Sequence, residues 1–311
     1  MAYKILVVDD DLAILRLIKK VLEYEKYEVV IRNNIEEIDL CDFTEFDLIL
    51  LDIMMPVIGG YNSRSLLPYL DFDEIEKSKK KFFGYSDITA IQLAILKKTN
   101  LKPIYGGSLI PTFGEYEGIS SFLKNTLDNL FFKENYTLEE PEFYSNKLLN
   151  AFTDEWKTKK REYIKNEGWK ILNEGETEGE VIIANIDTLV SLLATEYVPS
   201  FKDKILILEE MNATIDSEER NLNTLKLSGV FEGVKGLIFG KPEVYNNKNS
   251  NLEYIDIIKE VLGERNYPII YNFDCGHTIP SLIISQDSLL SLKANHKTGI
   301  KVEILKNSYI D

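Results

Sequence analysis

The first 58 residues alternate between patterns typical of strands and of helices, and this alternation constrains the fold more than any other feature. Lys4 to Val8 is a nearly continuous apolar run, which is typical of a strand buried in a parallel sheet. Leu12 to Leu22 carries apolar residues at helical spacing. Two more strands are predicted at 27–31 and 46–51, with a short helix at 34–40 between them. This order predicts a parallel sheet with right-handed crossovers.

The alternation resumes after Gly59-Gly60 and again in the second half of the chain. We predict further strands at 81–85, 181–183, 205–208, 237–240, 268–273, 289–292 and 301–305, and further helices at 88–98, 119–131, 186–195, 218–228 and 252–262. The stretch from about Pro141 to Gly179 is polar, and the segment 175–180 has little to bury. We therefore predict an α/β protein with an N-terminal domain over 1–145, a connection over 146–179 and a second domain over 180–311.

Composition excludes several classes of partner. The formal net charge of −15 argues against a nucleic-acid-binding surface and against docking on an anionic membrane. Cys41 and Cys275 are too far apart in sequence to indicate a disulfide framework or a zinc site. The N-terminus has no signal-peptide pattern, and no apolar stretch reaches the roughly 18 residues that span a bilayer. We expect a cytoplasmic protein.

Ser86 is the candidate nucleophile. It follows an apolar strand, stands two residues after Gly84 and precedes a predicted helix. A strand-to-helix turn exposes a serine hydroxyl, and the helix N-terminus favours developing negative charge. The backbone N–H of the next residue, Asp87, is a candidate donor for the oxyanion, although the Asp87 side chain could instead cap the helix.

A serine needs a base, and the chain has only two histidines. His296 stands among lysines and an asparagine, which indicates a solvated loop. His277 follows a buried-type strand and a glycine, which suits a base that projects from a strand end. The alternative is that His277 is an ordinary core or loop residue.

Three ordered blocks give these residues a family context. They are IGGYNSRSLLPYLD at 58–71, FGYSDITA at 83–90 and FDCGHT at 273–278, and LILEE at 206–210 lies between the last two. Together they resemble the LD-carboxypeptidase family of serine peptidases, and in particular its microcin C immunity branch, over about 58–305. The resemblance implies a C-terminal α/β domain of that type.

The resemblance also implies roles for individual residues. It places the carboxylate that orients His277 at Glu209, with Glu210 as the second choice because adjacent strand residues face opposite ways. It adds the backbone of Gly59 or Gly60 to the oxyanion donors, where glycine would allow close approach of the substrate. It implies a homodimer, and it implies hydrolysis without a metal or other cofactor.

Residues 1–57 resemble something else, the first half of a response-regulator receiver domain. KILVVDDD at 4–11 and LILLDIMMP at 48–56 carry this similarity. In receivers, residues matching Asp9 and Asp10 hold Mg²⁺ and the one matching Asp52 accepts a phosphoryl group. The N-terminal domain is therefore predicted to be a flavodoxin-like hybrid, receiver-like over 1–57 and peptidase-like over 58–145, in a chimeric chain.

Three functions follow from these resemblances. The first is a serine hydrolase that cleaves an amide near a free carboxylate, as in an LD-muropeptide, or an aminoacyl-nucleotide of the microcin C type. The second is a recombined or engineered hybrid scaffold with little activity, because the first strands of the peptidase are replaced. The third is a phosphate-accepting signalling module that uses Asp52 and Mg²⁺.

Overall fold

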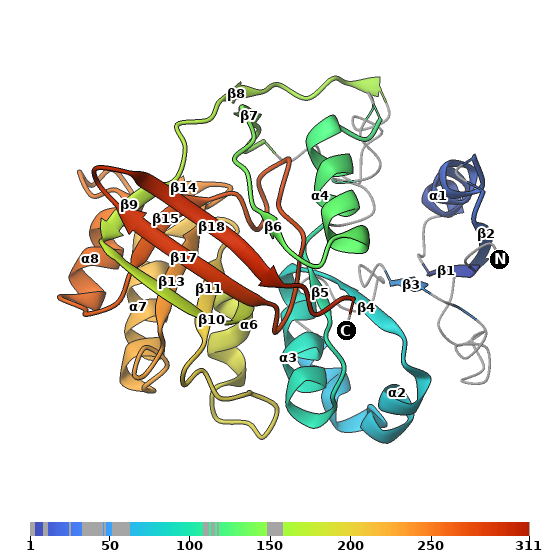
Figure 1. The fold of residues 1–311 in the computed structure, drawn as a ribbon, viewed down its shortest axis with the longest axis horizontal. Coiled ribbons are helices and arrows are strands. Elements are labelled where there is room, and N and C mark those ends of the chain that lie inside the picture. Colours follow the sequence, from blue (N-terminus) through green and yellow to red (C-terminus); the bar gives the residue numbers. More distant parts are fainter. Residues whose placement is uncertain are drawn as a thin grey trace.

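The computed structural model describes residues 4–8, 12–24, 26–32, 46, 48–51, 63–107, 112, 116, 118–147 and 158–310. The helix predicted at 34–40 lies outside these residues. Two sheets organise the described part of the chain, and helices cover them (Figure 1). This arrangement confirms the predicted α/β class.

The first sheet has six strands in the order β16-β5-β4-β3-β1-β2. Five of them pair in parallel, as predicted, namely β1 (Lys4–Val8), β2 (Glu28–Arg32), β3 (Leu48–Leu51), β4 (Lys81–Gly84) and β5 (Ile104–Tyr105). The receiver-like and peptidase-like parts meet where Leu48 pairs with Lys81 and Ile49 with Phe82. The sixth strand, β16 (Ile284–Ser285), comes from the distant C-terminal part of the chain and pairs antiparallel with β5.

The helices that accompany the first sheet are α1 (Leu12–Tyr24), α2 (Phe72–Ser78), α3 (Thr89–Lys98) and α4 (Ser121–Phe132), with short 3₁₀ helices η3 (Ser63–Tyr69) and η4 (Ser86–Ile88). Polar caps set where two of them begin. The Asp71 side chain accepts the backbone N–H groups of Asp73 and Glu74 in the first turn of α2, and the Ser120 side chain accepts that of Leu123 in α4. This cap at Ser120 moves the start of α4 slightly past the predicted Ile119.

The second sheet has eight strands in the order β6-β18-β17-β10-β11-β13-β15-β9. Its centre is parallel and consists of β10 (Gly175–Asn185), β11 (Ile205–Glu209), β13 (Gly236–Gly240) and β15 (Ile269–Phe273). Antiparallel strands flank it, namely β6 (Tyr136–Thr137), β9 (Lys170–Asn173), β17 (Leu289–Asn295) and β18 (Gly299–Lys306). Helices α6 (Ile186–Leu192), α7 (Ile215–Leu227) and α8 (Tyr254–Leu262) lie along one side of this sheet (Figure 1).

Strand residues of the second sheet alternate between two hydrophobic cores. The core on the helix side contains Ile182, Ala184, Leu206 and Leu208, whereas the other contains Val181, Ile183, Ile205 and Ile207. Both faces are buried, which explains why these strands are apolar throughout. The helix-side core also includes Leu93 and Ala94 of α3, so it continues from the first sheet to the second. The two sheets are thus held in contact where the candidate residues lie.

One predicted element is wrong. The polar sequence of segment 175–180 predicts a connection with little to bury. The structure shows instead that this segment forms the first half of β10 and pairs antiparallel with β17. Glu176, Glu178 and Glu180 point to solvent, while Thr177 and Gly179 lie on the covered side. The alternation of glutamate with smaller residues has the period of a one-sided strand. The division of the chain at 145 and 179 stays a prediction.

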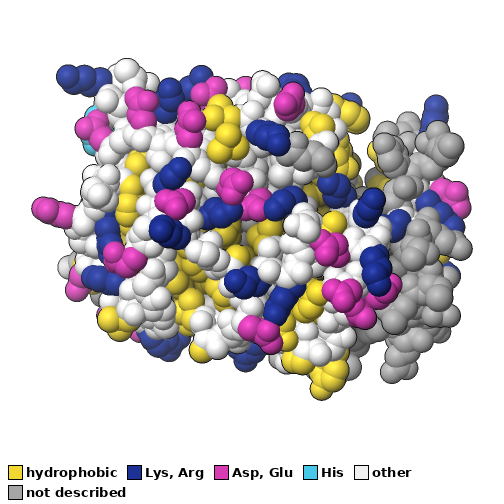
Figure 2. Space-filling model, turned by 60° about the horizontal axis from the view of Figure 1, so that its bottom comes forward, with side chains coloured by type: hydrophobic (Ala, Val, Ile, Leu, Met, Phe, Trp, Pro, Cys, Tyr) yellow, Lys and Arg dark blue, Asp and Glu magenta, His cyan; other side chains and the backbone are white. Residues whose placement is uncertain are grey.

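The surface carries both signs of charge. On the face shown in Figure 2, acidic and basic side chains are interspersed over the described residues, with apolar side chains between them. None of the helices that the structure describes is long and apolar enough to cross a membrane.

Candidate active site

Ser86 lies at the sharp turn between β4 and α3. Its backbone φ is +62°, a left-handed conformation that is unusual for a residue with a side chain. Gly84 makes the turn possible, because a Cβ atom there would lie 2.9 Å from Cγ2 of Ile88. The turn places Ser86 at the carboxyl edge of the sheet and at the start of η4, in agreement with the predicted strand-to-helix position.

Asp87 fixes this turn to the preceding 3₁₀ helix instead of capping α3. Its Oδ2 accepts the Ser63 backbone N–H at 2.8 Å, and its carbonyl accepts the Ser63 hydroxyl at 2.5 Å. The residue before α3 is Ile88, and it gives no side-chain cap. Asp87 thus does not occupy the cap position of α3, which is Ile88, and its Oδ2 binds Ser63. Its backbone N–H stays a predicted oxyanion donor.

Glu209 and His277 form a buried pair in the second half of the chain. Glu209 ends β11, and His277 lies in the loop after β15. Their Oε2 and Nδ1 atoms are 2.6 Å apart, and the two residues are 0% and 6% exposed. Two glycines enclose the carboxylate, since a Cβ at Gly276 would lie 2.5 Å from Oε2 and one at Gly240 would lie 2.9 Å from the Glu209 Cβ.

The surroundings of Glu209 keep it ionised. Burial on its own raises the pKa of Glu209, but the nearby His277 and hydrogen bonds from His277, Tyr105 and Asn185 outweigh burial and lower it. An ionised carboxylate can only accept, so it requires a proton on Nδ1 of His277. This tautomer leaves Nε2 of the imidazole as the acceptor, which is the form a general base needs.

Tyr85 brings the histidine next to the serine turn. The rings of Tyr85 and His277 are 4.6 Å apart between centroids. Tyr85 immediately precedes Ser86, so the imidazole packs against the residue adjoining the candidate nucleophile. Among the described residues, no hydrogen bond joins the Ser86 hydroxyl to His277 itself. Such contacts are often long in free enzymes and shorten when substrate binds.

Three residues of this site were missed by the sequence analysis as functional candidates. Tyr105 donates its hydroxyl proton to Oε1 of Glu209 at 2.7 Å, and Asn185 Nδ2 donates to the same oxygen at 3.1 Å. Thr89 Oγ1 lies 3.4 Å from the Tyr105 hydroxyl. The only sequence signal for Tyr105 and Asn185 is their position at the ends of β5 and β10, because the strand ends of a parallel sheet share one edge. Thr89 begins α3 and has no such signal.

Glu210, the second choice for the orienting carboxylate, does not contact His277 among the described residues. It accepts the backbone N–H groups of Met211 at 2.8 Å and Asp187 at 3.2 Å. Burial, followed by the charges of Glu218 and Asp187, raises the pKa of Glu210 to about 9. A protonated carboxyl at this position cannot serve as the anionic partner of an imidazole.

Several predicted site residues lie outside the described part of the chain. They are Gly59, Gly60, Asp9, Asp10 and Asp52. The other histidine, His296, is exposed, as predicted. Lys102 pairs with Asp287 at 2.5 Å. Within the described residues, no group of three or more His, Cys, Asp or Glu side chains is arranged to hold a metal ion.

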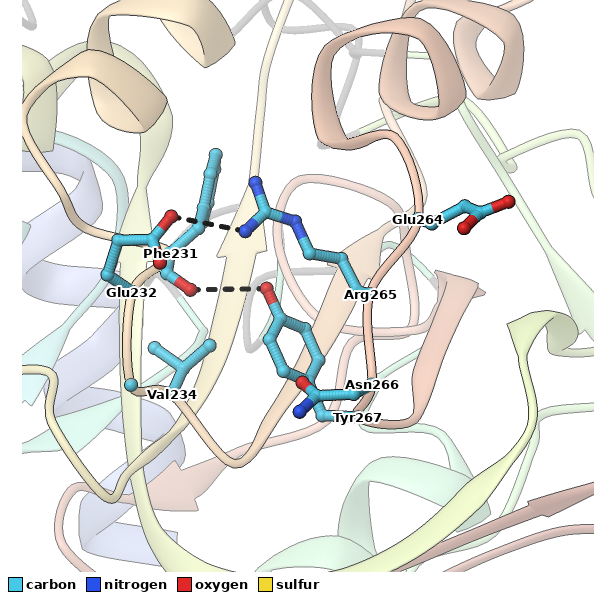
Figure 3. Close-up of a pocket in the computed structure, with 8 residues that line it drawn as sticks. Phe231, Glu232, Val234, Glu264, Arg265, Asn266 and Tyr267 are labelled. Atoms are coloured by element: carbon cyan, nitrogen blue, oxygen red, sulfur yellow. Dashed lines mark hydrogen bonds and ion pairs between the residues drawn. The ribbon is translucent and has the colours of Figure 1, made fainter.

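A cavity of about 610 Å³ lies elsewhere on the molecule (Figure 3). Its lining comes from residues 231–234 and 264–267, which precede β13 and β15. The cavity is therefore at the amino ends of the strands, whereas Glu209 and His277 follow the carboxyl ends. Arg265 in its wall already pairs with Glu232 at 3.2 Å. Ligands of α/β sheets bind at the carboxyl edge, so this cavity is not a candidate active site.

Three family models match the chain. The LD-carboxypeptidase N-terminal domain matches residues 46–106, and the LD-carboxypeptidase C-terminal domain matches residues 178–291. The response regulator receiver domain matches residues 5–71. A nisin biosynthesis regulatory protein of Lactococcus lactis is 57% identical over 61 residues, which are 19% of this chain and 27% of that protein. The chain thus joins a receiver-like segment to a peptidase-like remainder, as predicted.

Relatives and solved structures agree with the peptidase part. A Vibrio cholerae protein that carries the name of a carboxypeptidase is 34% identical, over 74% of this chain and 69% of its own. The microcin C7 self-immunity protein MccF of Escherichia coli is 33% identical, over 78% and 72%. A structure of MccF with glutamyl sulfamoyl guanosine superimposes with a TM-score of 0.84 at 25% identity, covering 99% of this chain and 97% of that one. The chain belongs to the LD-carboxypeptidase family.

Proposed function

We propose that this protein is a serine hydrolase in which Ser86 is the nucleophile, His277 the general base and Glu209 the residue that orients the imidazole. The observation that carries this proposal is the buried Glu209–His277 contact of 2.6 Å, packed through Tyr85 against a strained serine turn. A serine with unusual backbone geometry beside a base and its carboxylate is the constellation of nucleophilic acyl transfer.

The reaction would proceed in two halves. His277 Nε2 accepts the proton of the Ser86 hydroxyl while Oγ attacks the carbonyl carbon. The backbone N–H of Asp87 would donate to the resulting oxyanion, together with Gly59 or Gly60. The imidazolium then returns its proton to the leaving nitrogen, and an acyl-serine forms. Water, deprotonated by His277, attacks the acyl-serine, and the acid is released as Ser86 recovers its proton.

We propose an aminoacyl-nucleotide as the substrate class. The support is the similarity to MccF, whose solved structures include complexes with glutamyl sulfamoyl guanosine and aspartyl sulfamoyl adenosine at TM-scores of 0.84 and 0.83. A second candidate is the amide next to the free carboxylate of an LD-tetrapeptide, because the 34% identical Vibrio cholerae relative carries the carboxypeptidase name. A muramoyltetrapeptide carboxypeptidase of Oxalobacter formigenes shares the fold at 18% identity and a TM-score of 0.75.

The test is incubation of the purified protein with glutamyl sulfamoyl adenosine and, separately, with an LD-tetrapeptide, followed by mass spectrometry. Free glutamate or a shortened peptide is expected from the wild type and not from Ser86→Ala. Cleavage of one substrate and not the other assigns the substrate class. If the folded wild type cleaves neither, the hydrolase proposal fails for both classes, and the hybrid scaffold without turnover is favoured.

A further inference from the structure

The hydroxyl of Tyr105 contacts both halves of the candidate site. This side chain is 0% exposed and ends β5 of the first sheet. Its oxygen accepts the backbone N–H of Ser86 at 3.2 Å and lies 3.4 Å from Thr89 Oγ1. It also lies 2.7 Å from Oε1 of Glu209, at the end of β11 in the second sheet. One phenol oxygen therefore joins the serine turn to the carboxylate.

The neighbours fix the direction of each hydrogen bond. The Ser86 backbone N–H can only donate, and the ionised Glu209 can only accept, so the Tyr105 proton points toward Glu209. Thr89 Oγ1 accepts the backbone N–H of Asn185 at 3.0 Å, which leaves its own proton for Tyr105. The result is a directed chain from Asn185 through Thr89 and Tyr105 to Glu209. Chains of this kind strengthen each member.

The two oxygens of Glu209 thereby take different partners. Oε1 accepts from Tyr105 at 2.7 Å and from Asn185 Nδ2 at 3.1 Å, whereas Oε2 faces His277 at 2.6 Å. Two donors on one oxygen hold the plane of the carboxylate. That plane sets where Oε2 meets the imidazole.

We infer that Tyr105 is a positioning residue, which holds Glu209 toward His277 and holds the strained Ser86 turn against the second sheet. This inference rests on the proposed hydrolase function and adds a residue that the sequence resemblance did not point to. The hydroxyl proton of Tyr105 is donated to Glu209 and not to the Ser86 or His277 side chain. It acts by keeping the carboxylate and the nucleophile turn in register across the contact of the two sheets.

The chain supplies a matched control in Tyr136. This tyrosine is also buried and belongs to the same hydrophobic core as Tyr105, and its hydroxyl has no hydrogen-bond partner among the residues that the structure describes. Tyr136→Phe and Tyr105→Phe each remove a single buried oxygen. Only the second change removes an oxygen that is bonded to Glu209 and Ser86.

The first readout is steady-state kinetics with the substrate that the wild type cleaves. Removing a hydrogen bond to a charged group from the transition-state assembly lowers the rate about 10- to 100-fold. Tyr105→Phe is therefore expected to lower kcat about 10- to 100-fold, with KM nearly unchanged. Tyr136→Phe is expected to keep the wild-type kcat.

The second readout is the titration of His277, followed by NMR of the imidazole protons. The chain has two histidines, and the exposed His296 serves as an internal reference. Without the Tyr105 proton, more negative charge remains on Glu209, so His277 is expected to titrate at higher pH in Tyr105→Phe. A residue that served packing alone would leave this titration unchanged.

Other titratable groups besides His277 face Glu209. The titratable groups facing Glu209 are His277, Tyr105, Cys275, Glu210, Glu218 and Tyr254. Burial raises the pKa of both tyrosines and of the thiol, and burial together with neighbouring carboxylates raises the pKa of Glu210 to about 9 and of Glu218 to about 8. Below about pH 7 the five neighbours other than His277 therefore stay protonated.

The outcomes separate this inference from the proposed function. A wild type without turnover would end the hydrolase proposal, while the His277 titration would still decide the role of Tyr105. An unchanged titration and unchanged kcat in folded Tyr105→Phe would overturn the inference. If Tyr105→Phe does not fold, Thr89→Val removes the other side-chain donor to the same oxygen. That variant is expected to lower kcat about 2- to 3-fold, and wild-type kcat there would also refute the inference.

Discussion

A buried ion pair next to the candidate base gives a prediction whose size can be worked from the structure. Lys241 Nζ lies 2.6 Å from Oδ1 of Asp274, and their side chains are 5% and 0% exposed. Asp274 also accepts hydrogen bonds from Asn166 Nδ2, at 3.3 and 3.1 Å, and from Trp169 Nε1 at 2.9 Å. His277 follows Asp274 by three residues, so this pair anchors the loop that carries the imidazole.

Breaking the pair from either side is expected to be costly. Lys241→Met leaves the Asp274 charge buried with only neutral donors. Asp274→Leu leaves the ammonium with the Asn166 side-chain oxygen at 2.9 Å and the Tyr144 ring at 3.9 Å. Removing one partner of a buried pair costs about 3–5 kcal/mol, because the other charge stays out of water. We expect each single variant to lose about that much stability.

The double variant decides whether this reasoning holds. Lys241→Met with Asp274→Leu removes both charges of this pair, so its loss is expected to be no larger than that of either single variant. Urea unfolding followed by tryptophan fluorescence and circular dichroism measures the three losses. Losses that add up would refute the reasoning. Breaking the exposed Lys77–Glu74 pair is the control and is expected to change the unfolding midpoint little.

Three further predictions concern the site itself. Gly276→Ala would place a Cβ atom 2.5 Å from Oε2 of Glu209, at a backbone φ of +128°. We expect this change to displace the carboxylate and to lower kcat about 100-fold in the same hydrolysis assay. Unchanged turnover would mean that the carboxylate can shift freely. Glu209→Gln is expected to lower kcat about 10⁴-fold, since an amide can hold the wrong imidazole tautomer; a loss under 10-fold in kinetic assays would argue against the orienting role. The folded-state pKa values of about 9 for Glu210 and about 8 for Glu218 exceed the ordinary 4.5. The folded chain therefore binds more protons between these limits, and unfolding free energy should fall as pH rises from about 5 to 9. Glu210→Gln should flatten this dependence in urea unfolding at several pH values, and an equal slope would contradict it.

The sequence predicts the parts of the fold that depend on local pattern. Continuous apolar runs predict the parallel strands β1, β11, β13 and β15, because a strand covered on both faces needs no polar side. Gly84 and Ser86 predict the serine turn from local pattern as well, because a sharp strand-to-helix turn needs a residue without a side chain close to the serine. His277 could be chosen because the alternative, His296, stands among polar residues.

Apart from the Glu209–His277 contact, which the family resemblance implied, contacts between distant segments could not be predicted. Tyr105 and Glu209 are 104 residues apart, and a tyrosine at the end of a two-residue strand carries no local sign of its partner. The sequence also leaves a register of one residue open between Glu209 and Glu210, and the structure places Glu209 against His277. Segment 175–180 was misassigned because its glutamates suggested a solvated connection, although their alternation fits a strand with one covered face.

The hybrid chain can form one sheet because both of its parts extend the same parallel order. β3 of the receiver-like part pairs with β4 of the peptidase-like part through Leu48 and Ile49. Each new strand needs only backbone partners and an apolar face, so the sheet tolerates a change of sequence family at this boundary. The side chains at the strand ends have no such tolerance, because Tyr105 and Glu209 there bind each other with defined geometry.

The short strand β16 has a consequence for how the protein is made. Ile284 pairs with Tyr105, and the backbone N–H of Gln286 donates to Pro103 at 2.8 Å. The edge of the sheet that carries Ser86 is thus closed by a segment almost two hundred residues downstream. A ribosome must therefore release the chain as far as about residue 286 before this edge is covered. Nascent fragments that end between Ser86 and β16 would carry an open strand edge beside β5, so the proposed hydrolysis could begin only after this later segment has been made.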